Sequence, residues 1–500
     1  MATTSKLSST IAAERSGARA VVAIAALQLA ALLATATRYG FHRDEMYFVV
    51  AGSHPAAGYP DQPPLVPLLT HAMYTLDPGT PFLVRLPSAL VAAATTVLAA
   101  LVAREVGGGR RAQVIAAACT AASGFALAVG HFVTTTTFDL LSTTVFLWLV
   151  VRALMRREAW LLLPAGVVVG VGFEAKPQVG IVAVVAAAAL LAAGPRWPFR
   201  SAWTAAGAVA AVVLGAPYLV WQQRHGWPQV TVAGNIGGSA EGGRVGFVPF
   251  QLLLVSPVLV PVWIAGLLVP FRREALRPLR VVTLTYVALG VLYIAGNGKA
   301  YYLASLYPVL LGIGAVPAAA WTLRTRRHAQ ALTAAIVVSA VVSAFIALPL
   351  LPERSLQGSL VMAINPDQGE TVGWSRFVDA VAAAWRRIPA GARARTAIFT
   401  ENYGEAGAID LLGPSRSLPR AYSGHNGFGE WAIPPDRDTR ALVVGFGGPA
   451  DAAPSFAGCR PVGRVNDGVD LHNDEQGLPL LLCRPSAPWS ALWPRLRHYD

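Results

Sequence analysis

Eleven apolar stretches fill most of the first 350 residues, and they constrain the fold more than any other feature. A helix crosses the hydrocarbon core of a bilayer with about 20 apolar residues. Two of the stretches, 159–173 and 177–193, are short for a span. The eleven lie at approximately 19–38, 82–103, 112–130, 133–151, 159–173, 177–193, 203–221, 249–270, 280–296, 300–321 and 329–350. We therefore predict an α-helical integral membrane protein with a bundle of about 11 transmembrane helices.

The charged residues are scarce, and their placement predicts the topology. They make up 13% of the sequence, against about 25% in soluble domains. Arginines collect in alternate loops, for example at Arg104, Arg152 and Arg324, as in cytoplasmic loops. The other loops and the residues after 350 then face outside. The net charge of +13 is thus a topology signal, and no basic groove with interleaved aromatic residues indicates nucleic-acid binding.

Only three of the 40 basic residues are lysines, a skew typical of GC-rich bacterial genomes. We therefore expect the protein in a bacterial plasma membrane. Residues 351–500 contain no span and read as an extracytoplasmic α/β domain, with strands near 396–399, 441–446 and 478–482 and helices near 374–387 and 405–412. The predicted domains are accordingly 1–350 and 351–500. Cys459 and Cys483 both lie in the second, where a disulfide is compatible with an external location.

Unusual polar residues collect in the loops predicted to face outside. The first of these loops, 39–81, contains the adjacent acids Asp44 and Glu45. A carboxylate there can accept a proton from an acceptor hydroxyl, so that the oxygen attacks an anomeric carbon. Such a cluster suits transfer of a group from a lipid-linked phosphate carrier, because cationic side chains can stabilise the departing polyprenyl phosphate. The candidates for this second role are Lys176 and Lys299, with Arg43, Arg85 and Arg224 in reserve.

Several motifs resemble the bacterial branch of the protein O-mannosyltransferase superfamily. This is the GT-C group, which includes glycosyltransferase family 39 and the aminoarabinose transferases that act on lipid A. The similar segments are Arg43-Asp44-Glu45 with Tyr47, Tyr59-Pro60-Asp61-Gln62-Pro63-Pro64-Leu65, Arg85-Leu86-Pro87, Lys176-Pro177, Lys299 with Tyr301-Tyr302, Glu401-Asn402-Tyr403-Gly404-Glu405-Ala406-Gly407, and Tyr422-Ser423-Gly424-His425-Asn426. The resemblance covers roughly residues 20–350, with the last two segments in the C-terminal region.

The resemblance implies an inverting glycosyltransferase with a GT-C-type bundle and a sugar donor carried on polyprenyl phosphate. Asp44 maps to the catalytic base, supported by Glu45. Tyr301 and Tyr302 fall beside Lys299, in the group expected to bind the donor phosphate. Candidate acceptor or substrate contacts are Asp61, His131, Asp139, His425 and Asn426. The acceptor is a protein, a lipoglycan or another glycan, and the sequence specifies neither it nor the sugar.

Structural explanations compete with each of these roles. Asp44 and Glu45 can cap a helix, Lys176 can snorkel to lipid headgroups, and Lys299 can belong to an interfacial aromatic belt. Asp139 can pair with a neighbour, and His425 and Asn426 can form a turn. A divalent metal bound by His42, His54 and His131 with the two acids is a further hypothesis, although the histidines have no tight metal-ligand spacing.

Two other functions remain open at this point. One is a transporter or flippase for a lipid-linked sugar, and the other is an oligosaccharide ligase or polymerase using a diphosphate-linked donor. A transporter usually places polar groups near the membrane midplane, whereas here they gather towards one face. A diphosphate donor would call for more external cations than the sequence provides.

Overall fold

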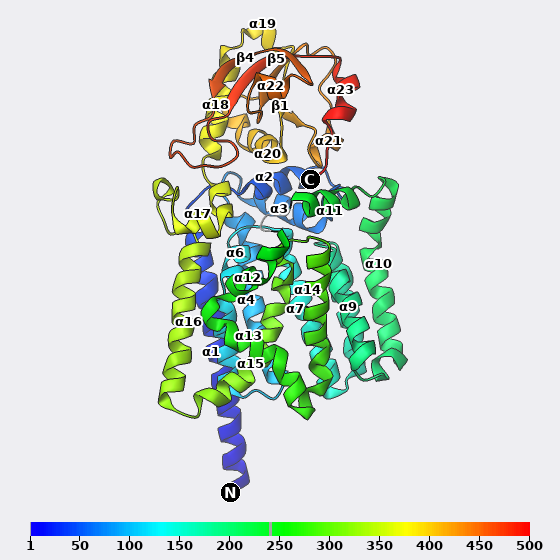
Figure 1. Ribbon diagram of the computed structural model, residues 1–500, viewed down its shortest axis with the longest axis vertical. Helices are drawn as coiled ribbons and strands as arrows, with labels where there is room; N and C mark the ends of the chain where they lie inside the picture. The colour runs from blue at the N-terminus through cyan, green and yellow to red at the C-terminus, as the bar shows by residue number, and fades with distance from the viewer. Residues whose placement is uncertain (1, 240–242) are drawn as a thin grey trace. The chain divides into compact units, whose positions relative to one another are not determined.

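The computed structural model describes residues 2–239 and 243–500 and divides the chain into two compact units (Figure 1). The helical unit comprises residues 1–35, 86–220 and 236–348. The second unit comprises residues 36–85, 221–235 and 349–500. The first predicted outer loop therefore groups with the C-terminal region, although the two are more than 250 residues apart in the sequence.

Among the described residues, seven helices are long and apolar enough to cross a membrane, or up to nine if each of two bent pairs is one span. The seven candidate spans are Gly17–Thr35 in α1 (Ala2–Thr35), α4 (Phe82–Glu105), α7 (Thr135–Arg156), α10 (Ala202–Arg224), Glu274–Ala295 with α14 (Arg280–Ala295), Ala300–Thr322 with α15 (Tyr307–Thr322), and α16 (Arg326–Ala347). Each of the eleven predicted stretches falls on one of these helices, on a bent pair, or on a shorter apolar helix.

Two bent pairs and two shorter helices account for the difference between the seven candidate spans and the eleven predicted stretches. The first, α5 (Arg110–Ala121) with α6 (Gly124–His131), bends by 57°, where the Ser123 hydroxyl caps α6. The second, α12 (Gly243–Val255) with α13 (Val260–Arg272), bends by 81° at Pro257. A proline supplies no backbone donor and interrupts a helix. The shorter helices are α8 (Leu162–Phe173) and α9 (Gln178–Ala193).

Small residues allow two helices of the helical unit to cross closely. A Cβ on Gly266 of α13 would collide with the backbone of Leu310 on α15, and one on Gly314 would collide with Val262. Such glycines let helix backbones approach each other where lipid gives no hydrophobic drive to associate.

A five-stranded mixed sheet organises the C-terminal part of the second unit. Its strand order is β2-β1-β3-β5-β4. The strands are β1 (Thr396–Thr400), β2 (Ala421–Ser423), β3 (Arg440–Val444), β4 (Phe456–Arg464) and β5 (Pro479–Pro485). β1 lies parallel to both β2 and β3, while β5 is antiparallel to β3 and β4. Three strands and two helices of this α/β domain were predicted from the sequence, and β2 and β4 were not.

Helices complete the second unit. One face of the sheet packs Phe399 and Phe456 against Trp489 of α23. Cys459 on β4 is disulfide-bonded to Cys483 on β5. The helices are α2 (Arg43–Gly52), α3 (Leu65–Leu76), the part of α11 (Pro228–Ser239) up to Asn235, α17 (Leu360–Ile364), α18 (Trp374–Arg387), α19 (Ala390–Arg393), α20 (Tyr403–Leu412), α21 (Phe428–Trp431), α22 (Pro449–Ala452) and α23 (Trp489–Leu496).

Candidate functional site

The two adjacent acids lie in the first turn of α2, where the sequence itself sets the helix start. The backbone N–H of Asp44 donates to Nδ1 of His42 at 3.2 Å, and the backbone N–H of His42 donates to Oε2 of Glu45 at 2.8 Å. This reciprocal capping satisfies backbone donors that a helix N-terminus otherwise leaves unpaired. The capping role considered for the acids is therefore real for Glu45.

Glu45 is also one half of a buried ion pair. The Nε of Arg85 donates to Oε1 of Glu45 at 2.9 Å, and Nη2 donates to Oε2 at 2.9 Å. The guanidinium further donates to the carbonyls of Ala36 and Gly40, both at 2.7 Å. The two side chains are 1% and 0% exposed. This geometry favours a positioning role for Arg85 and Glu45, whereas the donor-phosphate role of Arg85 stays a prediction.

Asp44 differs from its neighbour because part of its carboxylate is available. Oδ1 accepts a hydrogen bond from the hydroxyl of Tyr403 at 2.9 Å, and the side chain is half-buried. Within the described chain, Oδ2 makes no hydrogen bond. A carboxylate that is oriented through one oxygen and open at the other has the form required of a general base.

Arg43 completes the immediate surroundings of Asp44. Its guanidinium lies 5.0 Å from the centre of the Tyr403 ring and pairs with Glu370 and Asp474, each at 3.4 Å. Burial opposes its charge, but Tyr403, Glu370 and Asp44 together raise the pKa of Arg43. A permanent cation thus lies beside the candidate base.

Tyr403 reaches Asp44 because α20 packs closely against α2. A Cβ on Gly404 would lie 3.1 Å from Cβ of Arg43, and one on Gly407 would lie 3.2 Å from the backbone nitrogen of Tyr47. Glycine at these positions keeps the helices near enough for the Tyr403 hydrogen bond. The segment from Glu401 to Gly407 therefore acts structurally as the support of the candidate base.

Asp61 forms a second carboxylate centre. The hydroxyl of Tyr47 donates to Oδ1 of Asp61 at 2.7 Å and accepts a bond from the backbone of Gly427 at 3.1 Å. Burial raises the pKa of Asp61 to about 7, against the hydrogen bond from Tyr47, and the charge of Asp44 adds to the rise. Asp61 can therefore exchange a proton near neutral pH.

Three further acids crowd around Arg43. Glu475 is 3% exposed, and neither of its carboxylate oxygens has a hydrogen-bond partner in the described structure. Burial, together with Glu370 and Glu405, raises the pKa of Glu475 well above its usual value. Burial likewise raises the pKa of Glu405 to about 8. Between the unfolded and the folded pKa values, Glu405 and Glu475 therefore keep protons in the folded protein that they release in the unfolded chain.

This acid cluster predicts a specific pH dependence of stability. A carboxyl group whose pKa is raised on folding stabilises the folded state below the unfolded pKa, near 4.5. This contribution is lost as pH rises through the folded pKa, which is about 8 for Glu405 and well above 4.5 for Glu475. Glu475→Gln should therefore raise the free energy of unfolding by about 1–3 kcal/mol at pH 8 and by less at pH 5. Thermal unfolding at both pH values tests this, with the exposed Glu353→Gln as control. Equal effects of the two substitutions would contradict the account.

In the helical unit, Lys176 lies between α8 and α9, beside polar and aromatic side chains. Its Nζ donates to the hydroxyl of Thr136 at 2.8 Å and lies 5.0 Å from the centre of the Tyr302 ring and 5.6 Å from that of Tyr301. Burial lowers the pKa of Lys176 to about 8; the charge of Asp139 opposes this, and Lys299 adds to it. The two lysines are thus close enough to interact electrostatically.

The remaining candidates of the helical unit differ in exposure. Lys299 is exposed just before η5 (Ala300–Leu306), and within the described residues its ammonium group makes no hydrogen bond or ion pair. Asp139 is fully buried and accepts hydrogen bonds from Ser305 and Thr143, which favours the structural explanation. His131 is buried at the end of α6.

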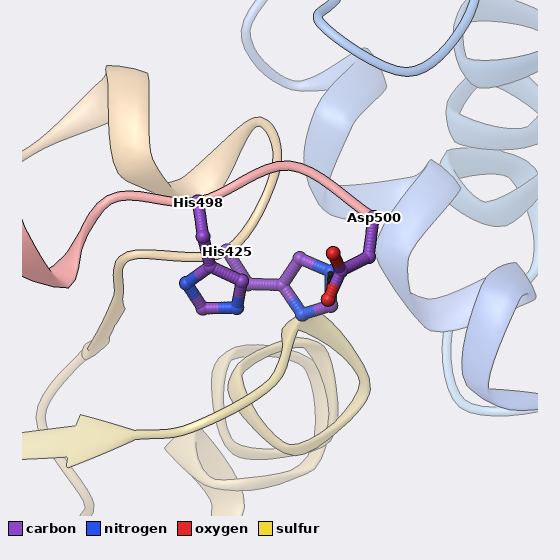
Figure 2. A group of neighbouring side chains, drawn as sticks. All are labelled: His425, His498 and Asp500. Atoms are coloured by element: carbon purple, nitrogen blue, oxygen red, sulfur yellow. Dashed lines mark ion pairs between the residues drawn. The ribbon is translucent and has the colours of Figure 1, made fainter. Parts of the chain in front are cut away.

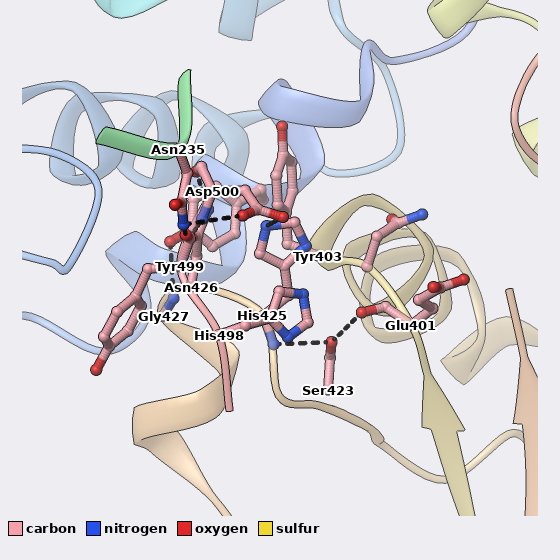
Figure 3. Close-up of polar contacts among 12 residues, drawn as sticks. Asn235, Glu401, Tyr403, Ser423, His425, Asn426, Gly427, His498, Tyr499 and Asp500 are labelled. Atoms are coloured by element: carbon pink, nitrogen blue, oxygen red, sulfur yellow. Dashed lines mark hydrogen bonds and ion pairs between the residues drawn. The ribbon is translucent and has the colours of Figure 1, made fainter. Parts of the chain in front are cut away.

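The other candidates of the second unit have three different surroundings. Arg224 is exposed at the end of α10. His425 follows β2 and faces His498 and Asp500 (Figure 2). Asn426 is 1% exposed; its backbone and side-chain amides donate to the carbonyls of His498 and Asp500, and its Oδ1 accepts from the backbone of Asp500 (Figure 3). This favours the turn explanation for Asn426.

The histidines proposed as joint metal ligands have separate roles in the structure. His42 caps α2, and the ring of His54 stacks on Trp431 with centroids 4.5 Å apart. The group of potential metal ligands found among the described residues includes none of these three histidines.

Tyr403 was missed as a functional residue by the sequence analysis. It belongs to a segment that resembles the family, but nothing in its sequence position indicates contact with Asp44, 359 residues away. The parallel pairing of β1 with β2 explains instead why Tyr403 lies beside His425. The residues after parallel strands meet at one edge of a sheet, which places Tyr403 and His425 side by side, with ring centroids 4.8 Å apart.

Comparison with known proteins agrees with this architecture. The family model for dolichyl-phosphate-mannose-protein mannosyltransferase matches residues 61–221. ArnT from Cupriavidus metallidurans bound to undecaprenyl phosphate is 16% identical and superposes with a TM-score of 0.60, covering 93% of this chain and 97% of that chain. The fold is that of ArnT. The apo state of the same protein gives a TM-score of 0.57 at the same identity and coverage.

A more distant structure shares part of the fold. The archaeal oligosaccharyltransferase AglB from Archaeoglobus fulgidus, in complex with an inhibitory peptide and a dolichol-phosphate, is 14% identical, with a TM-score of 0.51 over 78% of this chain and 63% of that chain. No curated protein matches the sequence. These findings confirm the predicted resemblance and the GT-C-type fold with its C-terminal sheet domain.

Proposed function

We propose that this chain is an inverting glycosyltransferase that moves a sugar from polyprenyl phosphate to an acceptor hydroxyl at the extracytoplasmic membrane face. The observation that carries the proposal is the carboxylate of Asp44, which Tyr403 orients through Oδ1 and which is open at Oδ2. The fold adds support, since ArnT, the structure it resembles, has been solved with undecaprenyl phosphate bound.

In the proposed reaction, Asp44 accepts the proton of the acceptor hydroxyl through Oδ2. The acceptor oxygen forms a bond to the anomeric carbon as the bond from that carbon to the donor phosphate breaks. Polyprenyl phosphate leaves with both electrons of that bond, and the configuration at carbon inverts. Tyr403 holds the carboxylate of Asp44 in position through its hydrogen bond to Oδ1.

The leaving phosphate requires cations, because it gains negative charge as it departs. We assign this role first to Lys176 and Lys299 of the helical unit, with the rings of Tyr301 and Tyr302 beside the ammonium group of Lys176. Lys176 fits best because its ammonium group is already fixed by Thr136 and the two tyrosine rings.

The assignment of Lys176 predicts a loss that depends on charge. Lys176→Gln keeps a donor for Thr136 but removes the cation, so kcat/KM for the lipid donor should fall about 100-fold. For the native lysine, kcat/KM should also fall as pH rises above about 8, where Lys176 loses its proton. Thr136→Val is the matched control for the hydrogen bond alone. A twofold or smaller loss of kcat/KM in Lys176→Gln would contradict the phosphate-binding role and favour the snorkelling role.

Donor selectivity tests the function itself. Purified protein should transfer sugar to membrane acceptors from a panel of polyprenyl-phosphate sugars, releasing polyprenyl phosphate, and should not use nucleotide sugars. Diphosphate-linked donors in the same panel separate a ligase or polymerase from the proposed enzyme. Movement of lipid-linked sugar across vesicles without any transfer would instead indicate a flippase.

The outward orientation can be tested in cells. Single cysteines placed beside Asp44 should react with impermeant reagents from outside, whereas a cysteine at Arg157, in a predicted inner loop, should be protected. The reverse labelling pattern would invert the topology and remove the extracytoplasmic assignment.

A further inference from the structure

Three side chains capable of binding a metal meet in the second unit, outside the residues used in the proposed reaction. His425 lies in the turn after β2, and His498 and Asp500 lie in the segment that follows α23. Backbone bonds join the two: His498 donates to the carbonyl of Gly424, and Asn426 donates to that of His498, both at 3.0 Å. The potential ligand atoms all lie within 4.8 Å of one another (Figure 2).

His425 is buried without satisfying its ring nitrogens. The residue is 6% exposed, and neither Nδ1 nor Nε2 has a hydrogen-bond partner among the described residues. Its Nε2 lies 3.9 Å from Oδ2 of Asp500. Buried polar groups are nearly always hydrogen-bonded, so this imidazole points to a missing partner.

Neighbouring groups orient the other two ligands. Nδ1 of His498 lies 2.9 Å from the carbonyl of Leu496, so it carries the proton and leaves the lone pair on Nε2. The side-chain amide of Asn235 donates to Oδ1 of Asp500 at 3.4 Å and leaves Oδ2 available (Figure 3). Such outer hydrogen bonds fix the tautomer of a ligating histidine and the direction of a ligating carboxylate.

We propose that His425, His498 and Asp500 form a binding site for a divalent transition-metal cation, with zinc the best match. Two imidazoles and one carboxylate suit Zn²⁺ and leave a fourth position for water. Tetrahedral ligands about 2.1 Å from zinc lie about 3.4 Å apart, so the group must contract. Asp500 is exposed and His498 is half-buried, and both can make this adjustment. Mg²⁺ and Ca²⁺ prefer all-oxygen ligands and should bind weakly.

The bound cation would fix the final segment to the turn after β2. The ring of His425 also packs against Tyr403, whose hydroxyl donates to Asp44. The cation would thus steady the side chain that orients the candidate base. The metal site itself does not depend on the proposed transfer reaction, and its test uses binding and stability alone.

Calorimetric titration with Zn²⁺ tests the site in the full-length protein, after a chelator has removed adventitious metal. The wild-type protein should bind one Zn²⁺ per chain and show a higher Tm with zinc. His498→Gln and Asp500→Asn should weaken binding at least ~10-fold and lose the rise in Tm. Both positions are partly exposed, so these variants should keep the fold. Cobalt offers a spectroscopic check, because tetrahedral Co²⁺ absorption should appear in the wild type and be lost in His498→Gln and Asp500→Asn.

His472→Ala is the matched control, since His472 is an exposed histidine of the same unit. It should bind zinc as the wild type does. Equal affinity in the wild type, His498→Gln and Asp500→Asn would overturn the proposal. A loss in His472→Ala as large as in those variants would also overturn it, because it would identify surface histidines as the binders.

Discussion

Asp44→Asn should lower kcat for sugar transfer about 1,000-fold, because general base catalysis by a positioned side chain contributes roughly 10²–10⁴-fold. The amide is nearly isosteric with the carboxylate and can still accept the hydrogen bond of Tyr403. The substitution should therefore leave Tm and donor KM nearly unchanged. Initial rates with a polyprenyl-phosphate sugar, measured beside thermal unfolding, provide the test.

Two companion variants separate catalysis from structure. Tyr403→Phe removes only the hydroxyl that orients Asp44 and should cost about 10-fold in kcat, a smaller loss than removal of a whole base. Asp77→Asn changes an acid of the same loop, bonded to Thr80 at 2.6 Å, and should have little effect. Wild-type turnover by Asp44→Asn would exclude Asp44 as the base.

Arg85→Met should produce the largest loss of stability, about 3–5 kcal/mol, because it leaves the carboxylate of Glu45 buried without its cation. It also removes the hydrogen bonds to the carbonyls of Ala36 and Gly40. Glu45→Gln should cost less, since an amide can still accept from Arg85 and from the backbone of His42. Thermal or denaturant unfolding in detergent measures both effects.

The same variants decide between the two roles considered for Arg85. If Arg85 binds the donor phosphate directly, Arg85→Met should raise the KM for the donor and leave Tm unchanged. If Arg85 only positions Glu45, Arg85→Met should lower Tm, and activity should fall only because the N-terminus of α2 is no longer held in place. The buried pair with Glu45 favours the second outcome.

Much of the fold follows from local sequence pattern. Apolar length located the described helices of the bundle, although it merged the two helices of each bent pair, and the runs at Thr396, Ala441 and Leu478 identified three strands of the sheet. The apolar pattern does not show where a helix changes direction, however, so the bends beside Ser123 and Pro257 were not predicted. Strand β2 has three residues and β4 is largely exposed along its length, so neither shows the buried alternation of a typical strand.

The candidate site was predictable only in part. Asp44 and Glu45 attract attention as adjacent acids beside an apolar helix, and Lys176 does so through the scarcity of lysine. The sequence does not show that Arg85 neutralises Glu45, or that Tyr403 reaches Asp44. Both contacts join residues far apart in the chain, at separations of 40 and 359 residues, and they exist only after tertiary packing.

The measurement that tests the central claim most directly is the anomeric configuration of the transferred sugar. A donor of defined configuration on polyprenyl phosphate would be used, and the linkage of the product would be read by NMR. Direct attack by an acceptor oxygen that Asp44 deprotonates predicts inversion at the anomeric carbon. Retention of configuration would require a second displacement and would contradict the account.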